Sequence, residues 1–218
     1  MWRTLREVLT RPQRFFEAEG RLDDPVAPLL VVSALATVSV LSILPAYLWM
    51  QSAYNLPTLN SVSLSVSGRS VESSGLSATL IGAALLSTFV AWFVHGTALY
   101  LGTLPFASEG SFRELLVATG WGYLPQVLAS VVTLAAVLSA TVVEPTSVPA
   151  RAEVTLANHA VVQSAQPRAL YTAAEAVGAA LTVWSGYVWF GAVRAVRGVS
   201  RRVGVGVVAL LVVLFVGL

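Results

Sequence analysis

Five long apolar stretches run along the chain, and polar segments rich in arginine, serine or proline separate them. The stretches cover residues 26–50, 76–104, 115–143, 170–193 and 203–218. Because a helix rises about 1.5 Å per residue, about 20 residues cross the roughly 30 Å hydrocarbon core of a bilayer. The pattern therefore predicts an all-α membrane protein, a bundle of about five transmembrane helices.

The last stretch, residues 203–218, is the shortest of the five. As a helix it reaches only about 24 Å at about 1.5 Å per residue. It crosses the hydrocarbon core only if the helix begins among the preceding arginines and their side chains snorkel to the interface. Five spans are predicted if it crosses, and four if it lies on the membrane surface.

The third stretch carries signals for an interrupted helix. Ser111 and Glu114 stand at capping-box spacing and predict a helix start in front of the apolar run. Two glycines and Pro125 then follow near residues 120–125. Since proline lacks a backbone N–H and clashes with the preceding turn, the helix is predicted to bend or break there.

An amphipathic segment, residues 1–25, precedes the first span. Trp2, Leu5 and Leu9 recur at helical spacing, and a second short helix is predicted after Pro12. We expect two short helices in the headgroup region with their apolar faces toward the lipid; a mobile solvated tail is the alternative. The chain thus divides into this cytoplasmic segment and a transmembrane domain, residues 26–218.

The two largest polar loops each contain a short alternation of apolar and polar residues. The alternating residues are Val62, Leu64 and Val66 in the first loop and Val154 and Leu156 in the second. Alternation with a period of two is typical of β-strands. A small hairpin is therefore predicted in each outer loop, with a disordered Ser-rich loop as the alternative in the first.

Composition agrees with a membrane protein. Hydrophobic residues make up 56% of the chain and charged residues 11%, whereas soluble domains carry about a quarter charged residues. The chain has no cysteine, which excludes disulfides and thiolate metal sites. The sequence pI is about 9.3, but the arginines cluster beside apolar runs, so no nucleic-acid partner is predicted.

All thirteen basic residues are arginines, and their distribution predicts an orientation. With a cytoplasmic N-terminus, ten of the thirteen lie in inner segments and three in outer loops. The positive-inside rule therefore predicts a cell-membrane protein with its N-terminus in the cytoplasm and, with five spans, its C-terminus outside. The absence of lysine beside many alanines, valines and glycines indicates a GC-rich genome and favours a prokaryotic source.

Two ionisable residues are functional candidates. His95 lies deep in the second span, on a row of small residues spaced by four, namely Thr79, Ala83, Ser87 and Ala91. The row favours a hydrogen bond across a close helix interface, and the alternative is a ligand or proton role. Glu175 lies near the outer end of the fourth span, where we interpret it as a helix-start carboxylate favoured by the dipole; a functional role is the alternative.

Little else in the sequence points to chemistry. Trp184, Ser185 and Gly186 resemble the serine motif of rhomboid proteases, but Val183 stands where that motif has a leading glycine. Two histidines, few acids and no thiol do not supply a closed metal site. With no nucleotide-binding motif either, we predict no catalytic residue, no metal and no cofactor.

The stretch Gly102–Pro125 is similar to the Yip1-domain family of membrane proteins. The residues that carry the similarity are Glu109, Gly110, Ser111, Phe112, Leu115, Leu116 and the run Trp121–Pro125. Pro12 with Phe15 and Phe16 resembles that family's N-terminal element, and Trp184 before a basic turn resembles its last hairpin. The resemblance implies a five-helix membrane domain with a cytoplasmic N-terminus.

Eukaryotic relatives of this type are associated with vesicle trafficking and small GTPases. Their DLYGP-like motif is missing here, where the corresponding region holds only Asp23, Asp24 and Pro25. GTPase binding is therefore not carried over, and the resemblance assigns no functional residue.

These observations lead to a principal functional hypothesis and two rivals. The principal one is a non-enzymatic membrane-organising or protein-interaction module that contacts the bilayer and a membrane-protein partner or a second copy of itself. The first rival is a small-solute transporter or permease subunit that uses His95 and the break at Pro125. The second is an intramembrane serine protease that uses Ser185.

Overall fold

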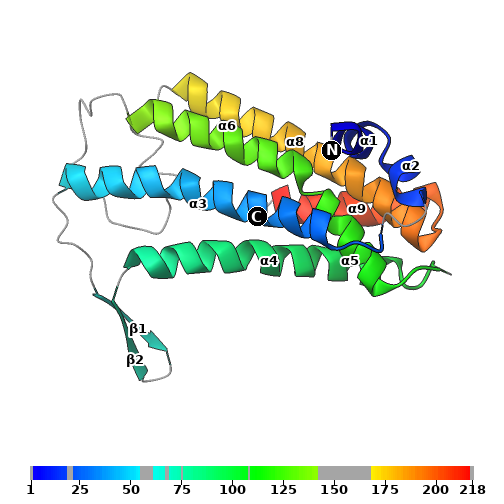
Figure 1. Cartoon of the computed structure of the whole chain (residues 1–218), viewed down its shortest axis with the longest axis horizontal. Coiled ribbons are helices and arrows are strands. Elements are labelled where there is room, and N and C mark those ends of the chain that lie inside the picture. The colour runs from blue at the N-terminus through cyan, green and yellow to red at the C-terminus, as the bar shows by residue number, and fades with distance from the viewer. Residues whose placement is uncertain are drawn as a thin grey trace.

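The computed structural model describes residues 2–18, 22–54, 61–66, 69–74, 76–107, 109–141 and 168–216. Four long helices run side by side along the long axis of the molecule (Figure 1): α3 (Val26–Tyr54), α4 (Leu76–Thr103), α6 (Leu124–Thr141) and α8 (Arg168–Arg197). Four shorter helices gather toward one end: α1 (Trp2–Thr10), α2 (Pro12–Glu17), α5 (Phe112–Trp121) and α9 (Arg201–Val216).

Local signals in the sequence account for several of the helix starts. The backbone N–H of Val26 donates to Oδ1 of Asp24 over 2.8 Å, which caps the first turn of α3. The predicted capping box in front of α5 is present, since Glu114 N–H donates to Ser111 Oγ and Ser111 N–H donates to the Glu114 carboxylate. Both caps satisfy backbone donors that a helix start leaves without partners.

Within the residues that the structure describes, three helical segments are long and apolar enough to cross a membrane: Ile81–Thr103, Phe112–Ala136 and Thr172–Arg197. The part of α3 whose side chains are described, Val26–Ser42, is apolar but shorter. Large apolar side chains point away from the bundle on α4, α8 and α9. Among the most exposed are Leu86 at 64%, Val183 at 63% and Val213 at 67%. Hydrocarbon rather than water suits such a surface.

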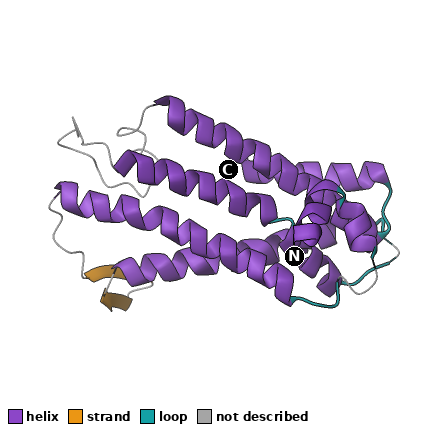
Figure 2. Ribbon diagram, turned by 45° about the horizontal axis from the view of Figure 1, so that its top comes forward, coloured by secondary structure: helices purple, strands orange, loops and turns teal. Residues whose placement is uncertain are grey.

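The polar segment between α3 and α4 contains the predicted hairpin (Figure 2). Strands β1 (Ser61–Val66) and β2 (Arg69–Ser74) pair antiparallel, with Ser61 opposite Ser74 and Val66 opposite Arg69. The alternation of valine and leucine with serine thus forms a strand, as the period of two predicts. The hairpin predicted at Val154 and Leu156 lies outside the described residues.

The N-terminal segment folds as two short helices, and three of their apolar residues face the bundle. Val8, Phe15 and Phe16 are almost fully buried, and the ring of Phe15 meets that of Trp121 edge-on at 5.3 Å between centroids. A Cβ at Gly191 would lie only 2.8 Å from Pro12 Cβ, so a missing side chain lets α2 approach α8. For Phe15 and Phe16 the predicted contact with lipid is corrected, because both rings are buried against the bundle.

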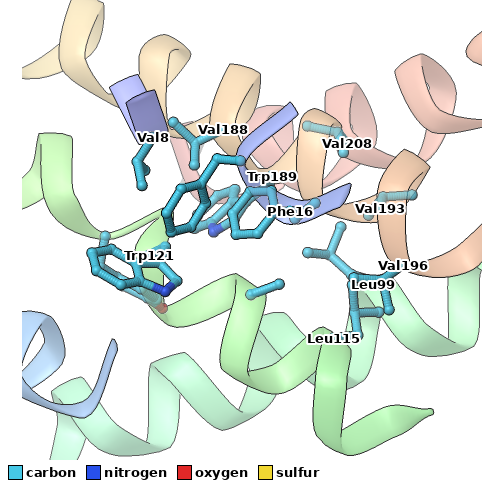
Figure 3. Close-up of a cluster of buried hydrophobic side chains, with 14 of the residues drawn as sticks. Val8, Phe16, Leu99, Leu115, Trp121, Val188, Trp189, Val193, Val196 and Val208 are labelled. Atoms are coloured by element: carbon cyan, nitrogen blue, oxygen red, sulfur yellow. The ribbon is translucent and has the colours of Figure 1, made fainter. Parts of the chain in front are cut away.

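The main core lies at the end of the bundle where the short helices meet the long ones. Figure 3 shows apolar side chains of α1, α2, α4, α5, α8 and α9 converging there. The labelled residues are Val8, Phe16, Leu99, Leu115, Trp121, Val188, Trp189, Val193, Val196 and Val208. This core ties the N-terminal helices to the long helices.

A tight turn joins α8 to α9. Helix α8 continues past Arg194 to Arg197, and Gly198 then adopts a left-handed φ of 60° that ends it. Helix α9 begins at Arg201, among the arginines that precede the last apolar run. Its C-terminal end lies about midway along the bundle in Figures 1 and 2.

Candidate functional site: a buried polar cluster at the helix break

The predicted break in the third apolar stretch is present. Helix α5 ends at Trp121 and α6 begins at Leu124, with Gly122 and Tyr123 as the turn between them. The N–H of Gly122 donates to Thr119 O over 3.0 Å, which tightens the last turn of α5. Pro125 is buried as the second residue of α6, a first-turn position where no intrahelical donor is needed.

The break positions Tyr123 against His95 of α4. The phenol oxygen of Tyr123 and Nδ1 of His95 form a hydrogen bond across 28 residues of sequence. Both side chains are buried, with 5% of Tyr123 and 6% of His95 exposed. Buried polar side chains that are hydrogen-bonded across helices hold a single packing arrangement, because separating them leaves polar atoms without partners.

Trp189 of α8 completes the cluster. Its indole ring stacks on His95 with 5.0 Å between centroids and meets Tyr123 edge-on at 5.7 Å. Its Nε1 donates to Thr119 O over 3.0 Å, so the indole satisfies a carbonyl at the end of α5. The missing side chain at Gly122 makes room, since a Cβ there would overlap the indole. Three elements therefore meet at one aromatic and imidazole stack.

A second polar contact lies between α6 and α8. Nε2 of Gln126 donates to Thr182 Oγ1 over 3.0 Å and to Ser185 Oγ over 3.3 Å. Ser185 is fully buried, and within the described part of the chain its hydroxyl bonds to no histidine. The pair of nucleophile and base that a serine protease requires is not formed at Ser185 in this structure.

The arrangement favours holding helices together over handling a ligand. His95 faces a closed interface of α4, α8 and the α5–α6 turn, with aromatic rings on two sides. Nε1 of Trp92 adds a bond of 2.9 Å to Leu116 O, again between α4 and α5. Across the ranges that the structure describes, no three histidine, aspartate or glutamate side chains gather as a metal site would need.

Comparison with known proteins identifies the family. The Yip1 domain matches residues 6–218, almost the whole chain. The chain belongs to the Yip1 family. Its resemblance to that family, predicted from the stretch Gly102–Pro125 and from the N-terminal proline and phenylalanines, is thereby confirmed. Together with its apolar helices, this membership makes the chain a membrane protein of Yip1 type.

A relative of this Yip1-family protein is an uncharacterized protein of Methanocaldococcus jannaschii. The two are 31% identical over 138 residues, which cover 59% of this chain and 84% of the relative. No solved structure matches the chain at a significant level. The comparisons therefore give the family and leave the specific role to physical argument.

A buried arginine holds the loop before α5 in this Yip1-family chain. Only 4% of Arg197 is exposed, and its NH1 donates to Glu109 O over 2.7 Å and also to Gly110 O. Its guanidinium lies 4.5 Å over the ring of Tyr100. Gly110 has a left-handed φ of 73°, and a Cβ there would overlap the Val196 carbonyl oxygen. The loop thus depends on both residues.

The structure corrects the interpretation of Glu175. Helix α8 begins at Arg168, so Glu175 stands beyond the first turn and is exposed on the helix surface. The dipole effect fades within the first turn of a helix, so it gives this carboxylate little stabilisation. Glu175 lies far along α8 from Trp189 and takes no part in the cluster described above.

The row of small residues that leads to His95 is buried only at one end. Ala83 and Ser87 are exposed, whereas His95 is buried, so close helix packing along the whole row is not observed within one chain. On α8, Gly178, Thr182 and Gly186 form a comparable row of small residues spaced by four, and this row is also buried only at one end. Gly186 approaches Val212 of α9, to which an added Cβ would come within 2.8 Å, while Gly178 has open space beside it.

Sequence reasoning found His95 and Pro125 but missed Tyr123, Trp189 and Arg197. Tyr123 carries one usable signal, since it lies inside the Gly/aromatic/Pro run at the break. Trp189 and Arg197 carry none, because an aromatic in an apolar span and an arginine at its end are both common in membrane proteins.

Proposed function

We propose that this Yip1-family chain is a non-enzymatic, multi-pass protein of a prokaryotic cell membrane that serves as a membrane-organising or protein-interaction module. In this proposal the chain crosses the bilayer five times, with α1 and α2 on the cytoplasmic side and the C-terminus outside. The fifth crossing is α9, which has 16 residues and ends about midway along the bundle, so it is the shortest of the five. The family, the three long apolar helices and the concentration of arginines in the inner segments support this topology.

The observation that carries the proposal is the closed packing around His95. A transport residue needs access to a wet cavity or a moving element. His95 instead lies between the rings of Trp189 and Tyr123, and the break at Pro125 is fixed by hydrogen bonds from α8 and within its own turn. These contacts favour a structural role for the residues on which the transporter hypothesis depends.

The partner in this proposal is a membrane protein or a second copy of the chain. Part of the bundle surface is available for such packing, because Ala83 and Ser87 of α4 are exposed and Gly178 of α8 has open space beside it. Small residues allow helix backbones to approach closely within a bilayer.

Reconstitution of the pure chain in liposomes distinguishes this function from transport. We expect no flux of amino acids, sugars or ions above that of empty liposomes, and elution in detergent as a homo-oligomer or with a co-purified membrane protein. Any flux reconstituted from the pure chain would contradict the proposal. A flux that His95→Ala abolishes would support the transporter that uses His95, and normal flux in that variant would remove His95 from the transporter hypothesis.

A further inference from the structure

An open pocket of about 390 Å³ lies where the N-terminal helices dock on α8. Its wall includes Arg11 between α1 and α2, and Gln13 and Arg14 of α2. Helix α8 supplies Tyr187 and Phe190. The pocket is separate from the His95 cluster and shares no residue with it. Its wall combines cationic, hydrogen-bonding and aromatic groups.

The charge around this pocket is positive. Arg11 and Arg14 are exposed, and both line the pocket. A third guanidinium stands behind the wall, since NH1 of Arg194 donates to Gln13 Oε1 over 2.7 Å and its centre lies 5.6 Å from the Phe190 ring centroid. The Nε of Arg194 is buried and has no partner among the described residues.

One carboxylate lies close by. The amide of Gln13 donates to Glu17 Oε1 over 2.7 Å, so this amide binds Arg194 through its oxygen and Glu17 through its nitrogen. The residues that line the pocket include two arginines and no acid, so its wall is positive. A ligand with a singly or doubly charged oxyanion therefore suits the pocket, because an arginine can donate two parallel hydrogen bonds to a carboxylate or phosphate.

Two aromatic residues of α8 place the pocket at an interface. Trp184 Nε1 donates to Leu9 O over 3.0 Å, and the Tyr187 hydroxyl donates to Thr10 O over 3.4 Å. Both side chains remain partly exposed, at 38% and 47%, next to the exposed apolar Val183. Tryptophan and tyrosine with one wet and one apolar side are typical of the headgroup level of a bilayer.

We propose that this pocket binds the phosphate of an anionic phospholipid, with Arg11 and Arg14 donating to its oxygens. The acyl chains then lie along the apolar outer face of α8 beside Val183, which a soluble phosphate ester would leave uncovered. The proposal rests on the proposed function only in that the chain sits in a bilayer. Bound lipid would join α2 to α8 on the cytoplasmic side.

Native mass spectrometry of the full chain in detergent tests the site. Phosphatidylglycerol and phosphatidylcholine with the same acyl chains are added in equal amounts, and the ratio of bound lipids is measured. We expect the unmodified protein to retain phosphatidylglycerol preferentially. In the double variant Arg11→Gln/Arg14→Gln, the ratio of bound phosphatidylglycerol to bound phosphatidylcholine should fall about tenfold, because each arginine near an anionic lipid contributes separately to binding.

Two further double variants serve as controls. Arg201→Gln/Arg202→Gln removes the same charge from exposed positions at the start of α9 and should keep the preference within about twofold. Arg11→Lys/Arg14→Lys keeps the charge, so the preference for phosphatidylglycerol should stay within about threefold of that of the unmodified protein. Equal loss in the α9 variant would show a diffuse charge effect, and complete loss in the lysine variant would show an effect on helix docking. Either result overturns the proposal.

Glycerol 3-phosphate separates a lipid from a soluble phosphate source. We expect millimolar glycerol 3-phosphate to leave bound phosphatidylglycerol in place, whereas its displacement would assign the pocket to a soluble phosphate ester and overturn the lipid assignment. The lipid ratio does not depend on how many times the chain crosses the bilayer or on any flux. The lipid site can therefore fail while the proposed function stands, and the reverse also holds.

Discussion

Gly122→Ala is expected to destabilise the chain by about 2–4 kcal/mol, because one methyl group would enter the space of the Trp189 indole. The backbone at Gly122 has a φ of −65°, which alanine adopts freely, so the effect comes from overpacking. Moving the indole also breaks its bond to Thr119 O and its stack on His95. Thermal unfolding in detergent, followed by tryptophan fluorescence, measures the loss.

The same substitution elsewhere provides a matched control. Gly206 of α9 has no atom within 4 Å of an added Cβ, so Gly206→Ala should leave stability unchanged or raise it by up to about 1 kcal/mol. In a Trp189→Leu background, Gly122→Ala should cost less than about 1 kcal/mol, since the clashing ring is gone. An equal cost in both backgrounds would contradict the assigned clash.

Arg197→Met should lower the free energy of unfolding by about 3 kcal/mol, because it leaves Glu109 O and Gly110 O without their donor. Arg197→Lys keeps a charge but cannot bridge two carbonyls in a planar fork, so about half of that loss is expected. The loop before α5 should also become sensitive to protease. Thermal unfolding and limited proteolysis near residues 107–111 measure the two effects.

Arg202→Met is the control for the buried arginine. Arg202 is exposed at the start of α9, and substitution of such a surface residue usually changes stability by no more than about 0.5 kcal/mol. If Arg197→Met behaved like Arg202→Met and left the loop resistant, the buried guanidinium would not be holding it.

Local signals in the sequence predicted much of the fold. The second span, predicted as residues 76–104, is α4, Leu76–Thr103, because its ends are sharp changes from polar to apolar residues. The capping box at Ser111 and the break near Pro125 depend on neighbouring residues alone, and both are present. The β1–β2 hairpin follows from alternation over a few residues.

Contacts between segments far apart in the chain could not be predicted from the sequence. An apolar face on α1 and α2 suits lipid or protein equally well, so the docking of Phe15 on Trp121 had no local signal. His95 bonds to Tyr123 because the α5–α6 turn directs the phenol toward α4. The position of that turn depends on α8, through the bond from Trp189 to Thr119 O. Arg197 was counted with the arginines that set orientation, yet it is buried against a loop far away in sequence.

Cysteine labelling tests most directly whether the chain crosses the bilayer five times from a cytoplasmic N-terminus. The chain has no native cysteine, so each introduced cysteine is the one labelling site in its variant. Three variants each carry one cysteine, Ser70→Cys, Ser200→Cys or Leu218→Cys. Each variant is treated with a membrane-impermeant maleimide, first in intact cells and then after permeabilisation. The account predicts labelling of Ser70→Cys and Leu218→Cys from outside, and of Ser200→Cys only after permeabilisation. Labelling of Ser200→Cys in intact cells, or of Leu218→Cys only after permeabilisation, would contradict it.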